Sequence, residues 1–419
     1  MPTLEQIQAA RERIRDQVVL TPCMPAPALH DDLPGELYRK LENLQRTGSF
    51  KDRGSLNRLL HLSDEERVRG VITASAGNHA QAVAYHASRM GIPATVVMPA
   101  TTPLIKVSNT RRHGARVILH GQRFSEAIEE SKRLESGEGL VMVHAYDDQA
   151  IIAGQGTIGL ELMEQLPELD LVVVPIGGGG VISGIAVAMK SLRPEVRVVG
   201  VEVEAAPSAR LSRDAGRVVE METADTLADG IAVKRLGDLT FPLIEEYVDD
   251  IVVVGEEEIA RAILLLLERK KTVVEGAGAA PVAGLLSGQI PVDPKEKVAA
   301  VLCGGNIDVN IISRIIDRGL VDDGRLARRT VRVPDRPGSL ARLTNLVAEA
   351  GGNVLEVAHQ RAFADISVGH VEIVVQLETR GREHVEEIME KIRATGTPVD
   401  ETVRPVRAVG RPGSPEATS

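Results

Sequence analysis

An alternation of short apolar runs and amphipathic stretches between residues 71 and 203 constrains the fold of this chain more than any other feature. Apolar runs bounded by turn residues predict buried strands, at residues 71–75, 94–98, 115–120, 171–176, 196–203 and, farther along, 298–303. The stretches between them predict helices at residues 78–90, 104–113, 124–134 and 181–192. Strands that alternate with helices are typical of parallel βαβ units. We therefore expect an α/β fold.

A second, shorter pattern begins after about residue 312. The polar stretch SRIIDRGLVDDGRLARR predicts a helical connector. The elements beyond it are predicted as strand 330–333, helix 339–349, strands 353–361 and 368–378, helix 382–393 and strand 398–404. This βαββαβ order is the ferredoxin-like plan. The last residues, 407–419, are rich in Pro, Gly and Ser, and we expect them to be disordered.

Composition excludes several classes of partner. The formal net charge is -10, and aromatic residues make up only 2% of the chain, so neither electrostatics nor base stacking favours binding to nucleic acid or anionic lipid. Two cysteines, Cys23 and Cys303, are too few for a disulfide framework or a Cys-rich zinc site. The N-terminus lacks the apolar segment of a signal peptide, and no apolar run could span a bilayer. We expect a cytoplasmic protein without a membrane partner.

Two glycine-flanked segments carry candidate chemistry. Lys51 stands in TGSFKDRG (47–54), and a desolvated lysine has a lowered pKa and can form an imine with a carbonyl group. A surface lysine in a loop fits the same spacing. Four glycines at 177–180 follow a predicted strand and open a helix, where backbone N–H groups can bind a phosphate. A tight turn that needs close packing also explains them. Ile182 and Ile185 exclude a dinucleotide fingerprint and a Walker loop respectively.

Two further segments join them. SAGNHAQ (75–81) lies between a strand and a helix, where backbone N–H groups bind carboxylates, although a simple helix cap would look the same. CGGN (303–306) ends a strand, where Cys303 faces either a ligand ring or the core. An imine-forming lysine and a phosphate-binding loop are what pyridoxal 5'-phosphate (PLP) needs, and an anion-binding helix start suits an amino-acid substrate.

Six motifs of the chain together resemble those of a known family. The motifs are KLENLQRTGSFKDRG (40–54), SAGNHAQ (75–81), IAGQGT (152–157), GGGGVISGIA (177–186), TLADGIAV (226–233) and CGGNID (303–308). In this order, over about residues 5–320, they resemble the threonine dehydratase (threonine ammonia-lyase) family of fold-type II PLP enzymes. Residues 329–405, with DRPGSL at 335–340, resemble an ACT domain, a small amino-acid-sensing module.

The resemblance implies a domain plan. A PLP-dependent catalytic domain would span residues 1–320, with two open, mostly parallel α/β subdomains, the smaller one (about 42–145) inserted in the larger. A linker at 321–328 would lead to a ferredoxin-like ACT domain at 329–406. Because ACT modules pair, a homo-oligomer, either dimer or tetramer, is expected.

The resemblance also assigns roles to single residues. Lys51 would carry the cofactor, Phe50 would pack beside its ring, Asn78 would bind its phenolic oxygen, and Cys303 would face its pyridine nitrogen. Its phosphate would be bound by the glycine loop, which consists of Gly177, Gly178, Gly179, Gly180 and the Val181 amide. The substrate carboxylate would be received by Ser75, Ala76, Gly77 and His79.

Two departures from the family pattern bear on the reaction. Racemases of this fold carry a serine where this chain has Ala76, and alanine cannot donate a proton on the face opposite the lysine. Elimination is therefore favoured over racemisation. Glu202 matches a cation-binding acid of some relatives, but Ser208 stands where racemases have Asp. We therefore expect no site for a divalent metal. A site for a monovalent cation near Glu202 and Ala206 stays open. A surface acid at the end of a strand explains Glu202 equally well.

The activity implied is dehydration and deamination of L-threonine to 2-oxobutanoate and ammonia, with L-serine giving pyruvate as a side reaction, as part of isoleucine biosynthesis. Serine dehydratase, hydroxyaspartate dehydratase and serine racemase stay open as alternatives within PLP chemistry. An amino-acid sensor without catalysis is the alternative outside it. Isoleucine or valine is the expected effector at the ACT domain, near Pro337, Gly338 and Asn353. The alternative is that this domain serves assembly only.

Overall fold

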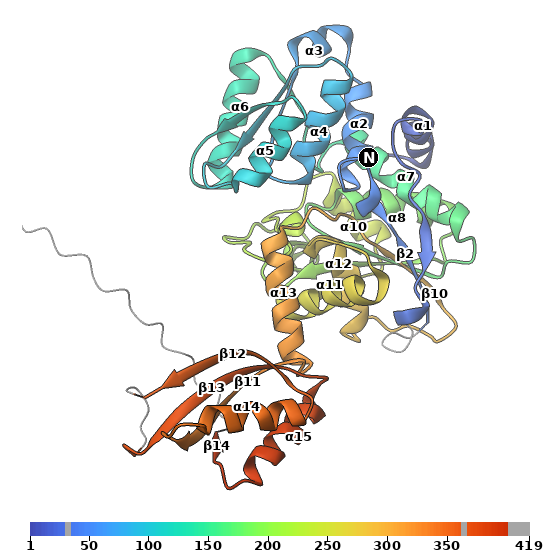
Figure 1. The fold of residues 1–419 in the computed structure, drawn as a ribbon. Coiled ribbons are helices and arrows are strands. Elements are labelled where there is room, and N and C mark those ends of the chain that lie inside the picture. Colours follow the sequence, from blue (N-terminus) through green and yellow to red (C-terminus); the bar gives the residue numbers. More distant parts are fainter. Residues whose placement is uncertain (30–34, 362–366, 401–419) are drawn as a thin grey trace, which may run out of the picture. The chain divides into compact units, whose positions relative to one another are not determined.

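The structure is a computed structural model that describes residues 1–29, 35–361 and 367–400 (Figure 1). The chain divides into two units, residues 1–309 and 310–419. Among the described residues, no helix is both long enough and apolar enough to cross a membrane.

The larger sheet of the first unit has six strands in the order β1-β2-β10-β7-β8-β9. Only β1 runs antiparallel to its neighbour, and the other pairs are parallel. The bounds are β1 (Cys23–Pro25), β2 (Glu36–Lys40), β7 (Leu171–Pro175), β8 (Arg197–Val203), β9 (Asp250–Val254) and β10 (Lys297–Val301). Every residue of β7 is buried, as a central parallel strand with both faces covered requires.

Helices surround this sheet. They include α8 and α12, which are buried along almost their entire length because small and aliphatic residues occupy all of their faces. The bounds are α1 (Leu4–Ile14), α2 (Lys51–Leu60), α7 (Gln149–Gln165), α8 (Gly180–Leu192), α9 (Ser208–Ala215), α10 (Thr240–Tyr247), α11 (Glu256–Lys270) and α12 (Gly276–Leu286). Three short 3-10 turns are η1 (Pro27–Leu29), η2 (Glu42–Leu44) and η3 (Asp229–Ile231).

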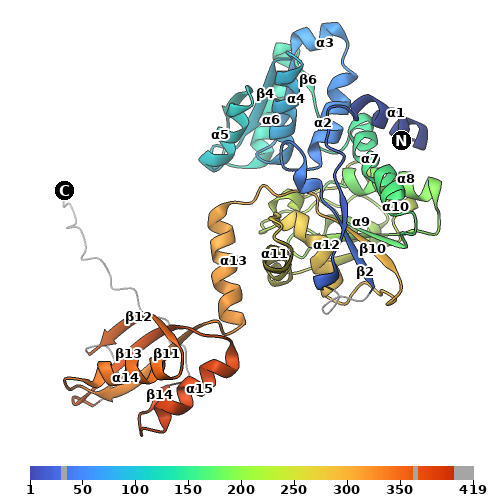
Figure 2. The ribbon, with the colours of Figure 1, turned by 45° about the vertical axis from the view of Figure 1, so that its right-hand side comes forward.

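The smaller sheet of the first unit has four parallel strands in the order β5-β4-β3-β6. Its elements are β3 (Val71–Ala74), β4 (Ala94–Met98), β5 (Arg116–Leu119), β6 (Val141–Met142), α3 (Asp64–Arg69), α4 (Asn78–Arg89), α5 (Leu104–Arg112) and α6 (Phe124–Glu138). In sequence this layer stands between β2 and β7 of the larger sheet (Figures 1 and 2). The predicted fold of open, mostly parallel α/β sheets is confirmed.

The second unit is a four-stranded antiparallel sheet in the order β12-β13-β11-β14. Its elements are α13 (Val309–Asp322), β11 (Leu326–Pro334), α14 (Ser339–Glu349), β12 (Asn353–Gln360), β13 (His370–Glu378), α15 (Arg382–Arg393) and β14 (Val399–Asp400). Buried residues of β11, β13, α14 and α15 form one hydrophobic core. The predicted βαββαβ order is confirmed.

Several predicted boundaries differ from the structure. β11 begins at Leu326, inside the expected linker, because Ala327 points to the core while Arg328 is exposed, so the polar stretch alternates as a strand does. The two units divide at 309/310, ahead of the expected boundary at 320. The strand predicted at 398–404 is described only to Asp400, and the predicted disordered tail lies outside the described residues.

Candidate active site

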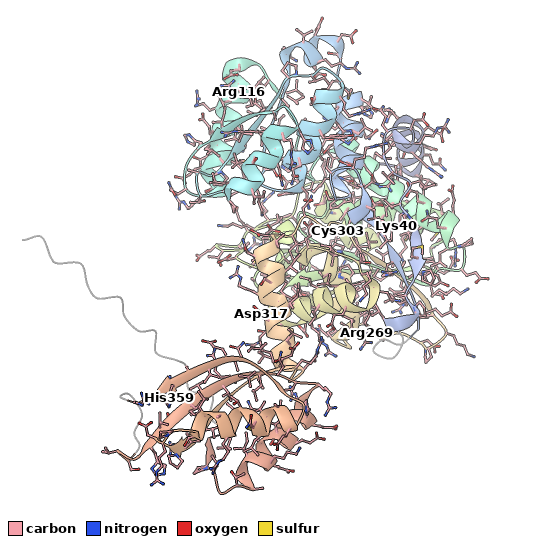
Figure 3. All side chains as sticks on the ribbon, viewed as in Figure 1. Lys40, Arg116, Arg269, Cys303, Asp317 and His359 are labelled. Carbon is pink, nitrogen blue, oxygen red and sulfur yellow. The ribbon has the colours of Figure 1, made fainter. Side chains whose placement is uncertain are left out.

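The loop before α2 and the segment after β10 hold each other in place. The Phe50 N–H donates to the Cys303 carbonyl at 2.9 Å, and the Gly305 N–H donates to the Gly48 carbonyl at 2.9 Å. These backbone hydrogen bonds bring Lys51, the first residue of α2, close to Cys303. Figure 3 labels Cys303 in the interior of the first unit.

The side-chain amine of Lys51 is buried, and no counter-ion among the described residues accompanies it. Its Nζ donates to the Ala145 carbonyl at 2.7 Å and lies 5.0 Å from the centroid of the Phe50 ring. Within the described part of the chain, no carboxylate forms an ion pair with it. Burial lowers the pKa of Lys51 to about 8, although Cys303 and Glu275 partly oppose that shift. The neutral, nucleophilic amine is therefore much more populated near neutral pH than in a surface lysine.

The glycine loop between β7 and α8 has no room for side chains. A Cβ on Gly178 would lie 2.3 Å from the Tyr146 ring, and a Cβ on Gly179 would lie 2.7 Å from Thr240 Oγ1. Gly179 also has a φ of +91°, which favours glycine. The loop therefore presents bare backbone at the N-terminus of α8, where N–H groups attract a phosphate. Tyr146 follows Ala145, so a single segment contacts both this loop and the Lys51 amine.

Asn78, the first residue of α4, is held by two side chains that the sequence analysis did not single out. Its Nδ2 donates to Glu275 Oε1 at 2.7 Å, and its Oδ1 accepts from Asn306 Nδ2 at 2.8 Å. Burial, and then the charge of Asp229, raise the pKa of Glu275 to about 7. Asn306 stands in the CGGNID motif, but Glu275 belongs to none of the segments recognised from the sequence.

The segment expected to receive a carboxylate forms the start of α4. Ser75 Oγ accepts from the N–H groups of Gly77 and Ala80, both at 3.3 Å. Nothing lies within 4 Å of the position of a Cβ on Gly77, so the loop borders open space there. Ala76 is half-buried and packs against the core of the smaller sheet.

The side chain of His79 packs in the core, while its backbone remains at the helix start. Its side chain is buried at 3% exposure, and its Nε2 lies 3.0 Å from the Val143 carbonyl. Burial, and then the charge of Lys51, lower the pKa of His79 to about 3, so the ring is neutral and Nε2 carries the proton that bonds this carbonyl. The side chain therefore packs in the core, and only the backbone of His79 belongs to the helix start. Sequence proximity to Asn78 gave no sign of this orientation, because a helix turns successive side chains about 100° apart.

Cys303 is buried at the end of β10, and burial raises the pKa of its thiol well above the ordinary value. The thiol is therefore neutral and a weak hydrogen-bond donor. A neutral partner of this kind suits a pyridine nitrogen that is not firmly protonated.

The surroundings of Glu202 explain this residue without a cation. Glu202 is fully buried, and its two carboxylate oxygens accept from the N–H groups of Ala209 at 2.7 Å and Arg210 at 2.8 Å. The carboxylate thus caps the N-terminus of α9, and the interpretation as a surface acid was wrong. Ala206 is buried nearby in the chain, and Ser208 begins α9. In the described ranges, no group of three or more His, Cys, Asp or Glu side chains could hold a metal ion.

In the second unit, Pro337 and Gly338 line a pocket of about 250 Å³, together with Arg336, His359 and Arg361. Asn353, predicted at the same site, does not line this pocket. It begins β12, and its Nδ2 donates to Glu378 Oε2 at 3.0 Å.

Comparison with known proteins identifies the family. Residues 14–304 match the family of pyridoxal-phosphate dependent enzymes, and residues 330–396 match the ACT domain. The chain belongs to the pyridoxal-phosphate dependent enzymes. The L-threonine ammonia-lyase of Thermotoga maritima is 52% identical over 397 residues, which cover 94% of this chain and 98% of that protein. The predicted membership of the threonine dehydratase family, with an ACT domain and PLP as cofactor, is confirmed.

Two further comparisons cover mainly the first unit. The catabolic L-threonine dehydratase TdcB of Escherichia coli K12 is 43% identical over 320 residues, which cover 76% of this chain and 97% of that protein. The structure of the processed form of threonine deaminase isoform 2 from Solanum lycopersicum matches with a TM-score of 0.72 and 36% identity, covering 76% of this chain and 90% of that chain.

The residues of this PLP enzyme fit its cofactor. Lys51 supplies a buried amine that forms no ion pair with a carboxylate of the described residues. Such an amine is readily unprotonated, and covalent attachment to an aldehyde requires the unprotonated form. The glycine loop supplies a cradle that a Cβ at Gly178 would obstruct. The Asn78 amide and the neutral Cys303 thiol supply polar groups for a ring with a phenolic oxygen and a nitrogen.

Proposed function

We propose that this PLP enzyme converts L-threonine into 2-oxobutanoate and ammonia, and L-serine into pyruvate more slowly. The observation that carries the proposal is the Lys51 amine, which is desolvated, has no counter-ion among the described residues and shares the Ala145–Tyr146 segment with the glycine loop. The names of the relatives that match almost the whole chain support threonine as the substrate.

Each residue has a defined task in this proposal. Lys51 holds the cofactor covalently between turnovers and, once released by the substrate amine, removes the α-proton as general base. The bound PLP supplies an electron sink for the carbanion that this proton transfer produces. The loop of Ser75, Ala76 and Gly77 leads into α4, whose first backbone N–H groups, at Asn78 and His79, bind the substrate carboxylate and so orient the α-hydrogen toward Lys51.

The alternatives within PLP chemistry differ at the same loop. Racemisation needs a proton donor on the face opposite Lys51, and Ala76 has no hydroxyl to provide it. Serine and hydroxyaspartate dehydratases need the same amine and glycine loop, so only a substrate profile separates them from a threonine enzyme. A sensor without catalysis would have no use for a desolvated lysine amine.

The second unit, which matches the ACT domain, supports regulation by an amino-acid end product, and we place the protein in the cytoplasm. We assign isoleucine or valine to the pocket beside Pro337 and Gly338, where Arg336 and Arg361 offer guanidinium groups to a carboxylate. Isoleucine as effector would tie the reaction to isoleucine biosynthesis. Pairing of ACT domains would make the protein a dimer or tetramer.

The test is formation of 2-oxo acids from L-threonine, L-serine and hydroxyaspartate by the PLP-loaded protein, with and without isoleucine. We expect 2-oxobutanoate to form fastest, D-serine to stay absent, and isoleucine to change the rate. Lys51→Ala should abolish turnover and the adduct that borohydride traps, whereas Lys190→Ala, which removes a surface ion pair with Asp249, should retain both. Near-normal turnover in Lys51→Ala would refute the proposed mechanism.

A further inference from the structure

The Asn78 side chain is fixed from two sides by residues far away in the sequence. Glu275 accepts from its Nδ2, and Asn306 donates to its Oδ1. Asn306 Nδ2 also donates to the Thr47 carbonyl at 2.7 Å, in the loop that precedes Lys51. Rotating the Asn78 amide by half a turn would set its oxygen against the Glu275 carboxylate and its NH₂ group against that of Asn306. The contacts therefore permit a single orientation of this amide.

Glu275 is itself held firmly. It occupies the N-cap position of α12 without a hydrogen bond from its side chain to the helix, and its backbone N–H donates to the Gly304 carbonyl at 3.1 Å. The side chain is only 4% exposed, and a Cβ on Gly304 would lie 2.3 Å from its Oε1, so the carboxylate occupies space that only glycine leaves free. Burying a carboxylate is costly unless donors satisfy it. The donors here are the Asn78 amide and the Asn306 backbone.

An amide nitrogen carries two N–H groups, and Glu275 takes one of those on Asn78. Within the described residues, the second has no protein acceptor. We propose that Glu275 is a positioning residue for the cofactor: with Asn306, it holds Asn78 so that this second N–H stays available to the phenolic oxygen of PLP. The inference rests on the proposed function, in which Asn78 binds that oxygen.

The charge of Glu275 makes the arrangement sensitive to pH. Four other groups act on its carboxylate: Asp229 of η3 and Lys106 of α5, which form an ion pair with each other, Lys51 of α2, and the neutral Cys303 thiol. Burial raises the pKa of Glu275 to about 7. Asp229 adds to this shift, whereas the hydrogen bond with Asn78 and the charge of Lys106 oppose it. Above that pH the ionised carboxylate makes a charge-assisted hydrogen bond to Asn78, and below it this hydrogen bond weakens. The hold on the cofactor should therefore weaken as the pH falls through 7.

The experiment compares Glu275→Gln with the wild-type holoenzyme. Glutamine keeps the shape and an acceptor oxygen but cannot ionise. We expect the absorption band of bound PLP in the wild type to shift with a midpoint near pH 7, because burial raises the pKa of Glu275 to about 7. We expect Glu275→Gln to lose this transition and to bind PLP about tenfold more weakly at pH 8, as for loss of one charge-assisted hydrogen bond. The PLP dissociation constant is measured by reconstituting the apoenzyme.

Glu202→Gln is the matched control, because Glu202 is also buried and burial also raises its pKa to about 7, yet it caps α9. Its spectral transition should match the wild type. If Glu275→Gln only lowers the melting temperature and keeps the wild-type transition and PLP affinity, Glu275 is an ordinary core acid and the inference is overturned.

Asn78→Ala separates the inference from the function on which it rests. If this variant changes the PLP band and affinity while Glu275→Gln does not, the role of Asn78 stands and that of Glu275 is overturned. If Asn78→Ala leaves both unchanged, the assignment of Asn78 to the cofactor fails, and the inference fails with it. Changes in both variants support the inference.

Discussion

Burial is the largest cause of the shifted pKa values of the three groups nearest the proposed chemistry. It lowers the pKa of Lys51, raises that of Glu275 and raises that of the Cys303 thiol, in each case disfavouring the charged form. The site therefore holds a neutral amine, a carboxylate that titrates near neutrality and a neutral thiol. Among the residues that the structure describes, none of the three groups forms an ion pair. Such a set suits a cofactor whose own phosphate brings the largest local charge.

The lowered pKa of Lys51 predicts the pH dependence of cofactor attachment. Only the neutral amine attacks the PLP aldehyde, so attachment to the apoenzyme should accelerate with rising pH and level off above about 8. The rate is measured by mixing apoenzyme with PLP and following the visible band, with borohydride trapping at each pH. A plateau near 10.5, the value of an unperturbed lysine, would contradict the burial argument.

At the level of single residues, the sequence was informative where one segment carries the function. Lys51, the glycine loop and Cys303 each stand in a motif whose local pattern indicates a role. Glu275 stands in no motif, and Asn306 stands in CGGNID without a pattern that indicates its role. Both act on Asn78 across large distances in the chain, 197 and 228 positions respectively. The direction of the His79 side chain could not be predicted, because its neighbours in sequence do not determine which way it points.

The glycine loop is the element on which phosphate binding depends most. Gly178→Ala would place a methyl group 2.3 Å from the Tyr146 ring and force that ring aside. Overpacking of this kind costs about 1–3 kcal/mol, and we expect PLP affinity to fall by about tenfold. Apoenzyme reconstitution measures this affinity.

Gly137→Ala is the control for this variant. Gly137 lies in α6, and nothing stands within 4 Å of its added Cβ. Alanine should stabilise this helix by about 0.5–1 kcal/mol and leave PLP affinity unchanged. Equal PLP affinity in Gly178→Ala and the wild type would mean that the loop does not contact the phosphate.

Among elements, apolar strands and amphipathic helices were predictable, and polar or glycine-rich ones were not. β2 has the sequence ELYRK, whose polar residues predict a segment on the surface. Arg39 and Lys40 are nevertheless buried, because residues distant in sequence accept their hydrogen bonds. α12 contains several glycines and Pro281, which are poor helix formers outside a packed core, although its alanines favour a helix. In both segments, contacts with residues distant in sequence determine the secondary structure.

At the scale of the first unit, one buried ion cluster joins segments that are distant in sequence. The Arg53 guanidinium donates to both oxygens of Glu42 at 2.8 Å and to those of Glu161 at 2.6 and 2.8 Å, and Lys40 also donates to Glu161 at 2.5 Å. The four side chains are at most 5% exposed. The cluster ties η2, β2 and α7 to α2, whose first residue is Lys51.

Arg53→Met should destabilise this unit strongly, because it leaves two buried carboxylates with too few cations. Breaking a buried pair typically costs about 3–5 kcal/mol, to be measured by urea unfolding followed by circular dichroism. Arg133→Met removes the exposed ion pair with Glu130 and should leave unfolding unchanged. Similar unfolding of Arg53→Met and the wild type would show that the cluster adds no net stability.

For the whole molecule, the division into two units predicts that catalysis and regulation separate. The Escherichia coli relative aligns along 97% of its length with 76% of this chain. A chain ending at Asp322, the end of α13, should form 2-oxobutanoate from L-threonine and lose its response to isoleucine. Its PLP band and circular dichroism establish that the shortened protein is folded.

A point variant tests the same separation in the full chain. Arg361 lines the pocket beside Pro337 and pairs with Asp335 at the surface, so Arg361→Ala removes one guanidinium without disturbing the core of the unit. It should leave the rate without isoleucine unchanged and raise the isoleucine concentration needed for half of the effect, because the amino acid's carboxylate loses a partner. An isoleucine response that survives in the shortened chain would place the effector in the first unit. A response lost only on shortening, and unaltered by Arg361→Ala, would move it to another surface of the second.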